Sequence, residues 1–111
     1  MYPYLQISSV IRATVLRGMY VPGQQMPPIR ILAEMEECNP AAVQKALKIL
    51  EEQGLIVSRG SKEYFVTESE KKIIELRNQN FNRLTKILFE KLYALGFSDS
   101  EIIKLFDRIE T

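Results

Sequence analysis

The sequence has no histidine, no tryptophan and a single cysteine, Cys38, among its 111 residues. Without histidine there is no imidazole to act as a general base, and a zinc site needs several Cys or His ligands, so both kinds of site are excluded. A lone cysteine also leaves no internal disulfide to form. We therefore expect a protein that is not an enzyme and that holds neither a metal nor a cofactor.

Long apolar runs and an excess of one charge are also lacking. No stretch approaches the roughly 18 apolar residues of a membrane span, and residues 1–4 have neither the basic nor the apolar part of a signal peptide. Lysine and arginine total 15 against 14 acidic residues, so the net charge is only +1. We expect a cytoplasmic protein with no membrane partner, in which any nucleic-acid binding depends on where the charges are placed.

Prolines are confined to the first 40 residues, so turns divide the front of the chain and the remainder is free of proline. Apolar spacing predicts a helix over residues 4–17 that ends at Gly18, an extended connection over 19–28, and a short helix over 29–37. The residues expected to face the core from these two helices are Ile7, Val10, Ile11, Thr14 and Val15, then Ile29, Leu32, Ala33 and Glu36.

A third helix has clear boundary signals. Asn39 can accept backbone N–H bonds as the N-cap, and Pro40 suits the first helical position because its missing N–H costs no hydrogen bond there. Gly54 ends the helix, which runs to Gln53. Its expected buried stripe is Val43, Ala46, Leu47 and Leu50.

Two short β-rich runs, 55–57 and 64–66, follow around a polar loop that contains glycine, and this pattern predicts a β-hairpin. Three helices and then a hairpin, with a tight turn between the second and third helices, is the order of a winged helix-turn-helix. The expected fold class is therefore mainly α with a small β-hairpin.

Beyond Thr67 the pattern is helical again, with Thr67 or Ser69 as the cap and Gly96 as the end. Ser98 and Glu101 form a capping-box pattern that opens a last helix, whose apolar residues are Ile102, Leu105 or Phe106, and Ile109. The long helix carries a regularly spaced apolar stripe: Phe81, Leu84, Leu88, Leu92 and Leu95. This stripe is either intramolecular core or a dimer interface closed by Ile102 and Phe106. We favour the interface, because the stripe is longer than a small domain can cover.

The front part of the chain resembles the GntR family of bacterial transcription regulators over residues 3–67. The resemblance rests on Tyr4-Leu5-Gln6-Ile7, Gly18, Pro22-Gly23, Met26-Pro27, Arg30, Leu32-Ala33, Asn39-Pro40, Val43, Ala46-Leu47, Leu50, Glu52, Gly54-Leu55-Ile56, Ser58-Arg59 and Phe65-Val66-Thr67. The remainder, especially 92–105, looks like the short C-terminal helical pair of the YtrA-type branch. The resemblance implies a winged helix-turn-helix DNA-binding domain over 1–67 and a two-helix dimerisation segment over 68–111.

The resemblance also implies a set of DNA-binding residues on the second and third helices and in the hairpin. They are Arg30, Asn39, Pro40, Ala41, Gln44, Lys45, Lys48, Arg59 and Lys62. Gln44 suits a bidentate bond to adenine, whereas lysine and arginine suit phosphate or guanine. The alternatives are an ordinary solvated helix face, a surface salt bridge of Arg30 with Glu34, and a solvated hairpin loop.

Two departures from the family pattern touch this surface. Ala41 and Ala42 stand where members commonly have Asn-Thr, and they offer only apolar contact, for instance to a thymine methyl group. Members normally have glycines just before the Phe-Val pair, whereas here Ser61-Lys62-Glu63-Tyr64 lead into Phe65, and the Glu63 carboxylate repels phosphate. These departures predict reduced base readout by the third helix and reduced entry of the hairpin into the minor groove.

We interpret the chain as a sequence-specific DNA-binding transcription regulator, a repressor that binds an inverted-repeat operator as a homodimer. The alternative is a winged-helix module that has lost base readout and docks a protein partner. Cys38 is expected to pack in the core, with redox sensing as the alternative. Glu34, Glu36 and Glu37 are interpreted as a solvated acidic face, in preference to a metal or acid–base site. The sequence identifies no small-molecule effector.

Overall fold

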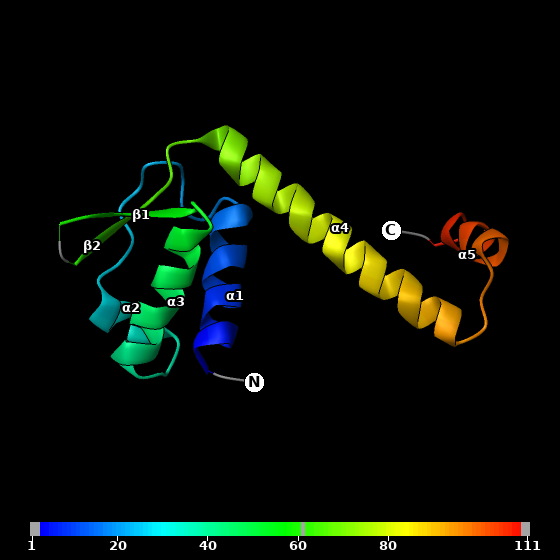
Figure 1. The fold of residues 1–111 in the computed structure, drawn as a ribbon, viewed down its shortest axis with the longest axis horizontal. Helices are drawn as coiled ribbons and strands as arrows, with labels where there is room; N and C mark the ends of the chain where they lie inside the picture. Colours follow the sequence, from blue (N-terminus) through cyan, green and yellow to red (C-terminus); the bar gives the residue numbers. More distant parts are fainter. Residues whose placement is uncertain (1–2, 61, 110–111) are drawn as a thin grey trace. The chain divides into compact units, whose positions relative to one another are not determined.

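A computed structural model describes residues 3–60 and 62–109, which form helices and a β-hairpin in the order expected from the sequence (Figure 1). Backbone contacts divide the chain into two compact units, Met1–Arg77 and Asn78–Thr111. Helix α4, Glu70–Ala94, begins in the first unit and continues into the second. Every helix within the described ranges is too short or too polar to cross a membrane.

Helix α1, Pro3–Leu16, buries three of the residues expected to face the core, namely Ile7, Ile11 and Val15. The expectation for Val10 is wrong, because this side chain is 44% exposed and Ser8 is buried instead. The three buried apolar residues succeed one another at intervals of four, so the buried face turns toward Ser8 and away from Val10. The Ser8 hydroxyl is satisfied locally, since it donates to the Leu5 carbonyl at 2.8 Å.

Helix α2, Ile29–Met35, ends two residues before the expected position. Glu37 adopts a φ of +51°, a left-handed conformation that cannot continue a helix. The N–H of Cys38 then donates to the Ala33 carbonyl at 2.9 Å and closes the turn. Of the side chains expected in the core, Leu32 and Ala33 are buried, whereas Ile29 and Glu36 are half-buried.

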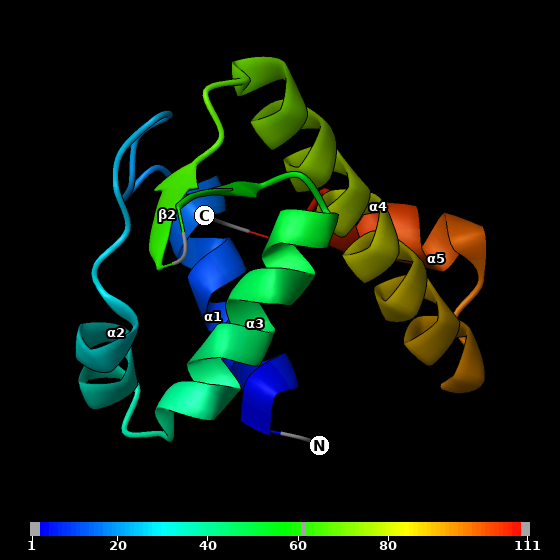
Figure 2. The ribbon, with the colours of Figure 1, turned by 60° about the vertical axis from the view of Figure 1, so that its left-hand side comes forward.

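Helix α3, Pro40–Glu52, confirms its sequence signals. The Asn39 side-chain oxygen accepts the Ala41 N–H at 2.8 Å, and Gly54 follows the helix with a φ of +80°. All four residues of the predicted stripe are fully buried: Val43, Ala46, Leu47 and Leu50. Helix α3 packs against α1, and α2 lies beside its N-terminal half (Figure 2).

Strands β1, Ile56–Arg59, and β2, Glu63–Val66, form the predicted antiparallel hairpin, with ends shifted by one or two residues. The register pairs Ile56 with Val66 and Arg59 with Glu63. Side chains alternate across a strand, so the hairpin has a core face and an outer face. The outer face carries Val57, Arg59, Glu63 and Phe65.

Part of the connection between α1 and α2 runs alongside β2 and pairs with it like a third strand. The sequence pattern did not predict this pairing. The N–H of Met26 donates to the Tyr64 carbonyl, and the N–H of Val66 donates to the Gln24 carbonyl, both at 2.8 Å. The next donor toward β2 in this register would be residue 28, and Pro28 has no N–H, so the pairing ends there. The hairpin is thereby held to the segment that leads directly into α2.

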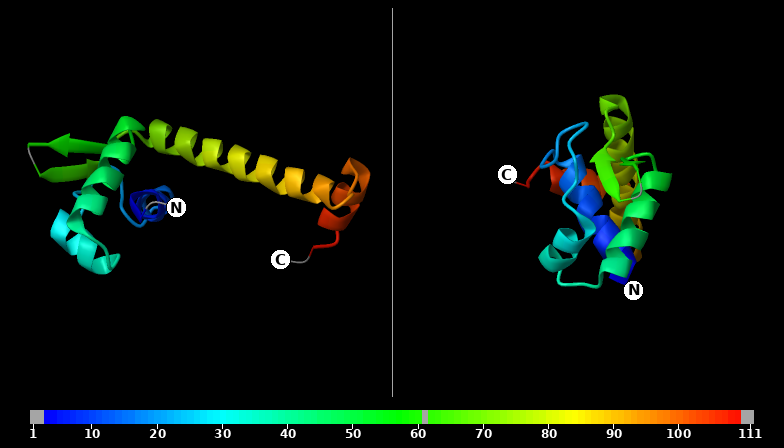
Figure 3. Two further views of the ribbon diagram at one scale, coloured as in Figure 1. Left: turned by 60° about the horizontal axis from the view of Figure 1, so that its bottom comes forward. Right: turned by 90° about the vertical axis from the view of Figure 1, so that its left-hand side faces the viewer.

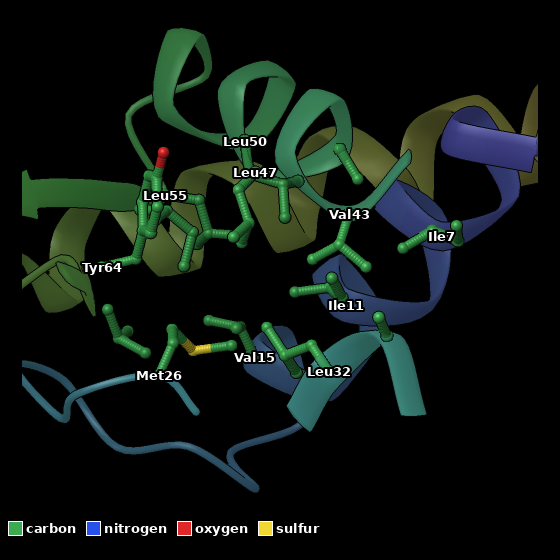
Figure 4. Packing of buried hydrophobic residues seen from close by; sticks show 14 of the residues in the cluster. Ile7, Ile11, Val15, Met26, Leu32, Val43, Leu47, Leu50, Leu55 and Tyr64 are labelled. Carbon is green, nitrogen blue, oxygen red and sulfur yellow. The ribbon is translucent and has the colours of Figure 1, made fainter. Parts of the chain in front are cut away.

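Apolar side chains from α1, α3, the hairpin and the connections form the core of the first unit (Figure 4). Helix α4, which is capped by the Ser69 hydroxyl accepting the Lys72 N–H at 3.1 Å, adds Leu76 to this core. Leu76 is 7% exposed, and Ile73 packs against the same cluster. The first turns of α4 are therefore part of the winged-helix unit, and the contact boundary lies inside α4, after Arg77.

In the second unit, helix α5, Asp99–Phe106, lies beside the C-terminal part of α4 (Figure 3). The predicted capping box is confirmed, because the Ser98 hydroxyl accepts the Glu101 N–H at 3.2 Å and the Glu101 carboxylate accepts the Ser98 N–H at 3.1 Å. Ile102 is 2% exposed, and the rings of Phe89 and Phe106 lie 6.2 Å apart. These contacts hold α5 against α4.

Candidate nucleic-acid interface

The side of α3 opposite its buried stripe presents four predicted contact residues to solvent: Ala41, Gln44, Lys45 and Lys48. Ala42 differs from them, because it is half-buried and packs against the core cluster. Of the alanine pair that replaces the common polar pair, only Ala41 can therefore offer its methyl group to a partner.

A shallow hollow brings together predicted residues from three elements. It is lined by Pro28, Ile29, Arg30, Pro40, Gln44 and Lys62. Arg30 comes from α2, Gln44 from α3 and Lys62 from the turn between the strands. Two cations beside a neutral amide provide donors for phosphate oxygens and a group able to read a base edge.

Lys45 lies elsewhere on α3, toward α1. Its Nζ atom is 4.9 Å from the centroid of the Tyr4 ring. A cation–π contact at an exposed site contributes about 0.5–1 kcal/mol, so it orients the lysine without holding it firmly. Lys45 is therefore free to bind a phosphate next to the side of α3 that faces α1.

Both arginines of the predicted set have carboxylate neighbours. Arg30 lies 3.8 Å from Glu34, which is the salt bridge considered as an alternative to DNA contact. Arg59 lies 3.4 Å from Glu68, and its guanidinium lies 4.7 Å from the centroid of the Phe65 ring. Ion pairs this exposed contribute up to about 1 kcal/mol, so neither arginine is prevented from binding another anion.

The N-terminal end of α3 carries the partial positive charge of the helix dipole. Asn39 and Pro40 are exposed there, so the start of the helix is accessible to an anion. Glu37 lines an adjacent hollow with Arg30, and Glu63 is exposed in the hairpin. These carboxylates lower the positive potential of the surface, consistent with the small net charge of the chain.

Cys38 is half-buried at the turn between α2 and α3 and packs against the core cluster. Burial raises the pKa of the Cys38 thiol, and the nearby Glu36 carboxylate adds to the rise. Both effects favour the neutral thiol, which is the less reactive form. Among the residues that the structure describes, no three His, Cys, Asp or Glu side chains are arranged to hold a metal ion.

The residues predicted for a dimer interface fall into two groups in the second unit. Between 45% and 75% of the surface is exposed for Phe81, Leu84, Leu88 and Leu95. Leu92, Ile102 and Phe106 instead line an apolar hollow where α5 meets α4. The first group is an exposed apolar stripe, and the second group lies at the contact between the two helices.

Sequence reasoning missed Tyr4, Phe65 and Glu68 as neighbours of the predicted cations. Phe65 lies diagonally across the hairpin from Arg59, a relation that follows from the register once it is known. Tyr4 and Glu68 carry no local signal, because they contact Lys45 and Arg59 only after the chain has folded.

Comparison with known proteins identifies the family. The sequence model of the family described as "Bacterial regulatory proteins, gntR family" matches residues 3–66. This chain belongs to the GntR family. Among its relatives, the uncharacterized HTH-type regulator YhcF of Bacillus subtilis is 24% identical over 101 residues, which cover 91% of this chain and 84% of YhcF. The repressor YtrA of the same organism is 34% identical over 68 residues, which cover 61% of this chain and 52% of YtrA.

The solved structures agree with this assignment. A GntR family transcriptional regulator from Listeria monocytogenes is 30% identical and superposes with a TM-score of 0.88, over 99% of this chain and 96% of its own. The predicted winged-helix fold class and the resemblance to YtrA-type GntR regulators are thus confirmed. The chain is a transcription regulator with a DNA-binding winged helix, and it is not an enzyme.

Proposed function

We propose that this GntR protein is a repressor that binds an inverted-repeat operator as a homodimer in the cytoplasm. The observation that carries the proposal is the hollow in which Arg30, Gln44 and Lys62 converge from three elements beside the exposed face of α3. A relative that shares the winged-helix part, YtrA, is named as a repressor.

In this proposal α3 enters the major groove. Gln44 reads a base edge, most simply adenine, and the Ala41 methyl group contacts a thymine methyl group. Arg30, Lys48, Arg59 and Lys62 bind phosphates, with Lys45 binding phosphate or guanine on the α1 side. Asn39 and Pro40 place the positive end of α3 next to the backbone.

The second part of the proposal concerns residues 68–111 as the dimerisation segment of a DNA-binding domain over 1–67. Two copies that pair through Phe81, Leu84, Leu88 and Leu95 would cover an apolar stripe otherwise left in water. Leu92, Ile102 and Phe106, which line the hollow between α4 and α5, would complete the interface. A two-fold dimer presents two recognition helices about 34 Å apart, which matches one turn of DNA and requires an inverted repeat.

The proposal is tested by selecting duplexes from a random-sequence pool with the purified full chain. We expect an inverted repeat, and we expect the logarithm of the affinity to fall against log salt by about 0.9 for each phosphate neutralised. Placing the selected duplex over a reporter promoter should lower expression when the chain is present. A salt-independent affinity contradicts the DNA-binding surface, and unchanged or increased expression contradicts repression.

The second candidate is a winged-helix module that docks a protein partner without reading bases. Ala41 at a position that is commonly polar, and Glu63 in the hairpin, favour it. The same selection separates the two, because a chain that enriches no sequence and binds all duplexes equally has no base readout.

A further inference from the structure

Arg59, one of the two basic residues of the hairpin, makes an exposed ion pair on the outer face of the hairpin. The Nη2 atom of Arg59 lies 3.4 Å from the Oε1 atom of Glu68, and the two side chains remain 59% and 78% exposed. The Phe65 ring supports the same guanidinium, with its centroid 4.7 Å from the Cζ atom. Arg59 is therefore in contact with a carboxylate and an aromatic ring while it is still accessible to a larger anion.

We propose that Glu68 is an intramolecular competitor of DNA phosphate for Arg59, and that it sets the affinity of the hairpin for DNA. The inference rests on the proposed function, since it concerns the same DNA-binding surface. A carboxylate and a phosphate both offer oxygens to the donors of a guanidinium, so Arg59 exchanges one for the other when DNA binds.

The carboxylate that acts on Arg59 is that of Glu68 and not that of Glu63, the residue that pairs with Arg59 in the hairpin. Glu63 lies opposite Arg59 in the hairpin, yet the carboxylate within ion-pair distance of Arg59 is that of Glu68. Glu68 follows β2 and lies close to the tight turn at Gly23, where an added Cβ would be 3.4 Å from its Cγ atom. The carboxylate is therefore presented to Arg59 from outside the strand pair.

Two effects follow for DNA binding. Phosphate competes with Glu68 for the donors of Arg59, and a carboxylate that stays close to the bound phosphate also repels it. Because the pair is exposed, removing the competing charge should tighten binding by up to about fivefold for each hairpin that contacts DNA.

A double-mutant cycle on the full chain tests this. The probe is a duplex that the wild-type chain selects from a random pool, and affinity is measured for wild type, Glu68→Gln, Arg59→Gln and the double variant. We expect Glu68→Gln to tighten binding in the wild-type background and to tighten it clearly less in the Arg59→Gln background, where only the direct repulsion between Glu68 and phosphate is left. Thermal unfolding of each variant checks that the exposed substitutions leave the fold intact.

Glu34→Gln is the matched control, because it removes the same charge from the other exposed pair, Arg30 with Glu34. Any gain from Glu34→Gln should be equal in the wild-type and Arg59→Gln backgrounds. A Glu68→Gln variant that binds no tighter, or that gains equally with and without Arg59, overturns the inference. A wild-type chain that selects no duplex overturns the proposed function instead.

Discussion

Single residues on the exposed face of α3 differ in which groups of DNA they can bind. Gln44 lines the same hollow as Arg30 and Lys62, whereas Lys45 contacts Tyr4 on the side of α3 that faces α1. A neutral amide both donates and accepts and so matches the hydrogen-bond pattern of adenine, whereas an ammonium only donates and binds phosphate oxygens or the acceptors of guanine. The residues of one helix therefore differ in what they contribute to binding.

This difference predicts distinct effects of two substitutions on α3. Gln44→Ala should cost about 1–3 kcal/mol on the selected duplex and little on random DNA, whereas Lys48→Ala should weaken both duplexes alike. Titrations of each variant with both duplexes measure the two losses. Equal losses on the two duplexes for Gln44→Ala would assign this residue to phosphate contact.

The backbone of Glu37 predicts a stabilising substitution. A non-glycine residue at a φ of +51° pays a steric cost that glycine avoids. Glu37→Gly should raise the free energy of unfolding by about 0.5–1 kcal/mol, measured by urea denaturation. Glu36→Gly is the control, because Glu36 has an ordinary φ of −94° and glycine there should destabilise the fold. A loss of stability in Glu37→Gly would contradict the assigned backbone strain.

At the scale of elements, α4 is the one whose role differs most from its sequence pattern. Its apolar stripe from Phe81 onward predicts an interface, but its first turns serve the core of the winged-helix unit through Leu76 and Ile73. One helix therefore links the two units, with its buried side chains at its start and its exposed apolar side chains farther along.

This division predicts the behaviour of fragments. Residues 1–77 should unfold with a free energy about 2–3 kcal/mol above that of residues 1–67, because the longer fragment buries Leu76. Chemical denaturation of both fragments gives the difference. In the longer fragment, Leu76→Ala should remove most of it, and Ile74→Ala should cost less, because Ile74 is 56% exposed. Equal stability of the two fragments would show that α4 adds nothing to the core.

At the scale of the whole molecule, the proposed mechanism requires DNA contact and dimerisation, and each of the two compact units carries the residues for one of them. The first unit carries the exposed face of α3 and the hairpin, and the second carries the apolar stripe. One winged domain covers one half-site, so tight binding to a full operator depends on pairing through the second unit.

The stripe predicts a separation of folding from assembly. Phe81→Glu places a charge on a side chain that is 68% exposed, so it should leave the chain folded but monomeric at micromolar concentration. Its affinity for the full inverted repeat should then fall toward that for a half-site. Sedimentation and binding to whole and half operators measure both effects.

Met19→Glu is the control, because Met19 is similarly exposed, at 62%, but lies outside the stripe. This variant should remain as dimeric as the wild-type chain. A wild-type chain that sediments as a monomer would remove the proposed interface altogether.

The sequence by itself determined the features that depend on residues within a few positions of one another. The cap at Asn39, the first-turn Pro40, the stripe from Val43 to Leu50 and the capping box at Ser98 are confirmed, because helix geometry relates neighbours three and four apart. The family also follows from the sequence, because its motifs are ordered along the chain.

Only the tertiary structure decided which distant groups meet. Pairing of Gln24 and Met26 with β2 joins backbone groups far apart in the chain, and any residue except proline can donate such a bond, so no residue type announces it. The contacts of Glu68 with Arg59, of Tyr4 with Lys45 and of Leu76 with the core are likewise set by how the elements pack. Packing depends on the summed burial of many side chains, and local spacing carries no record of that sum.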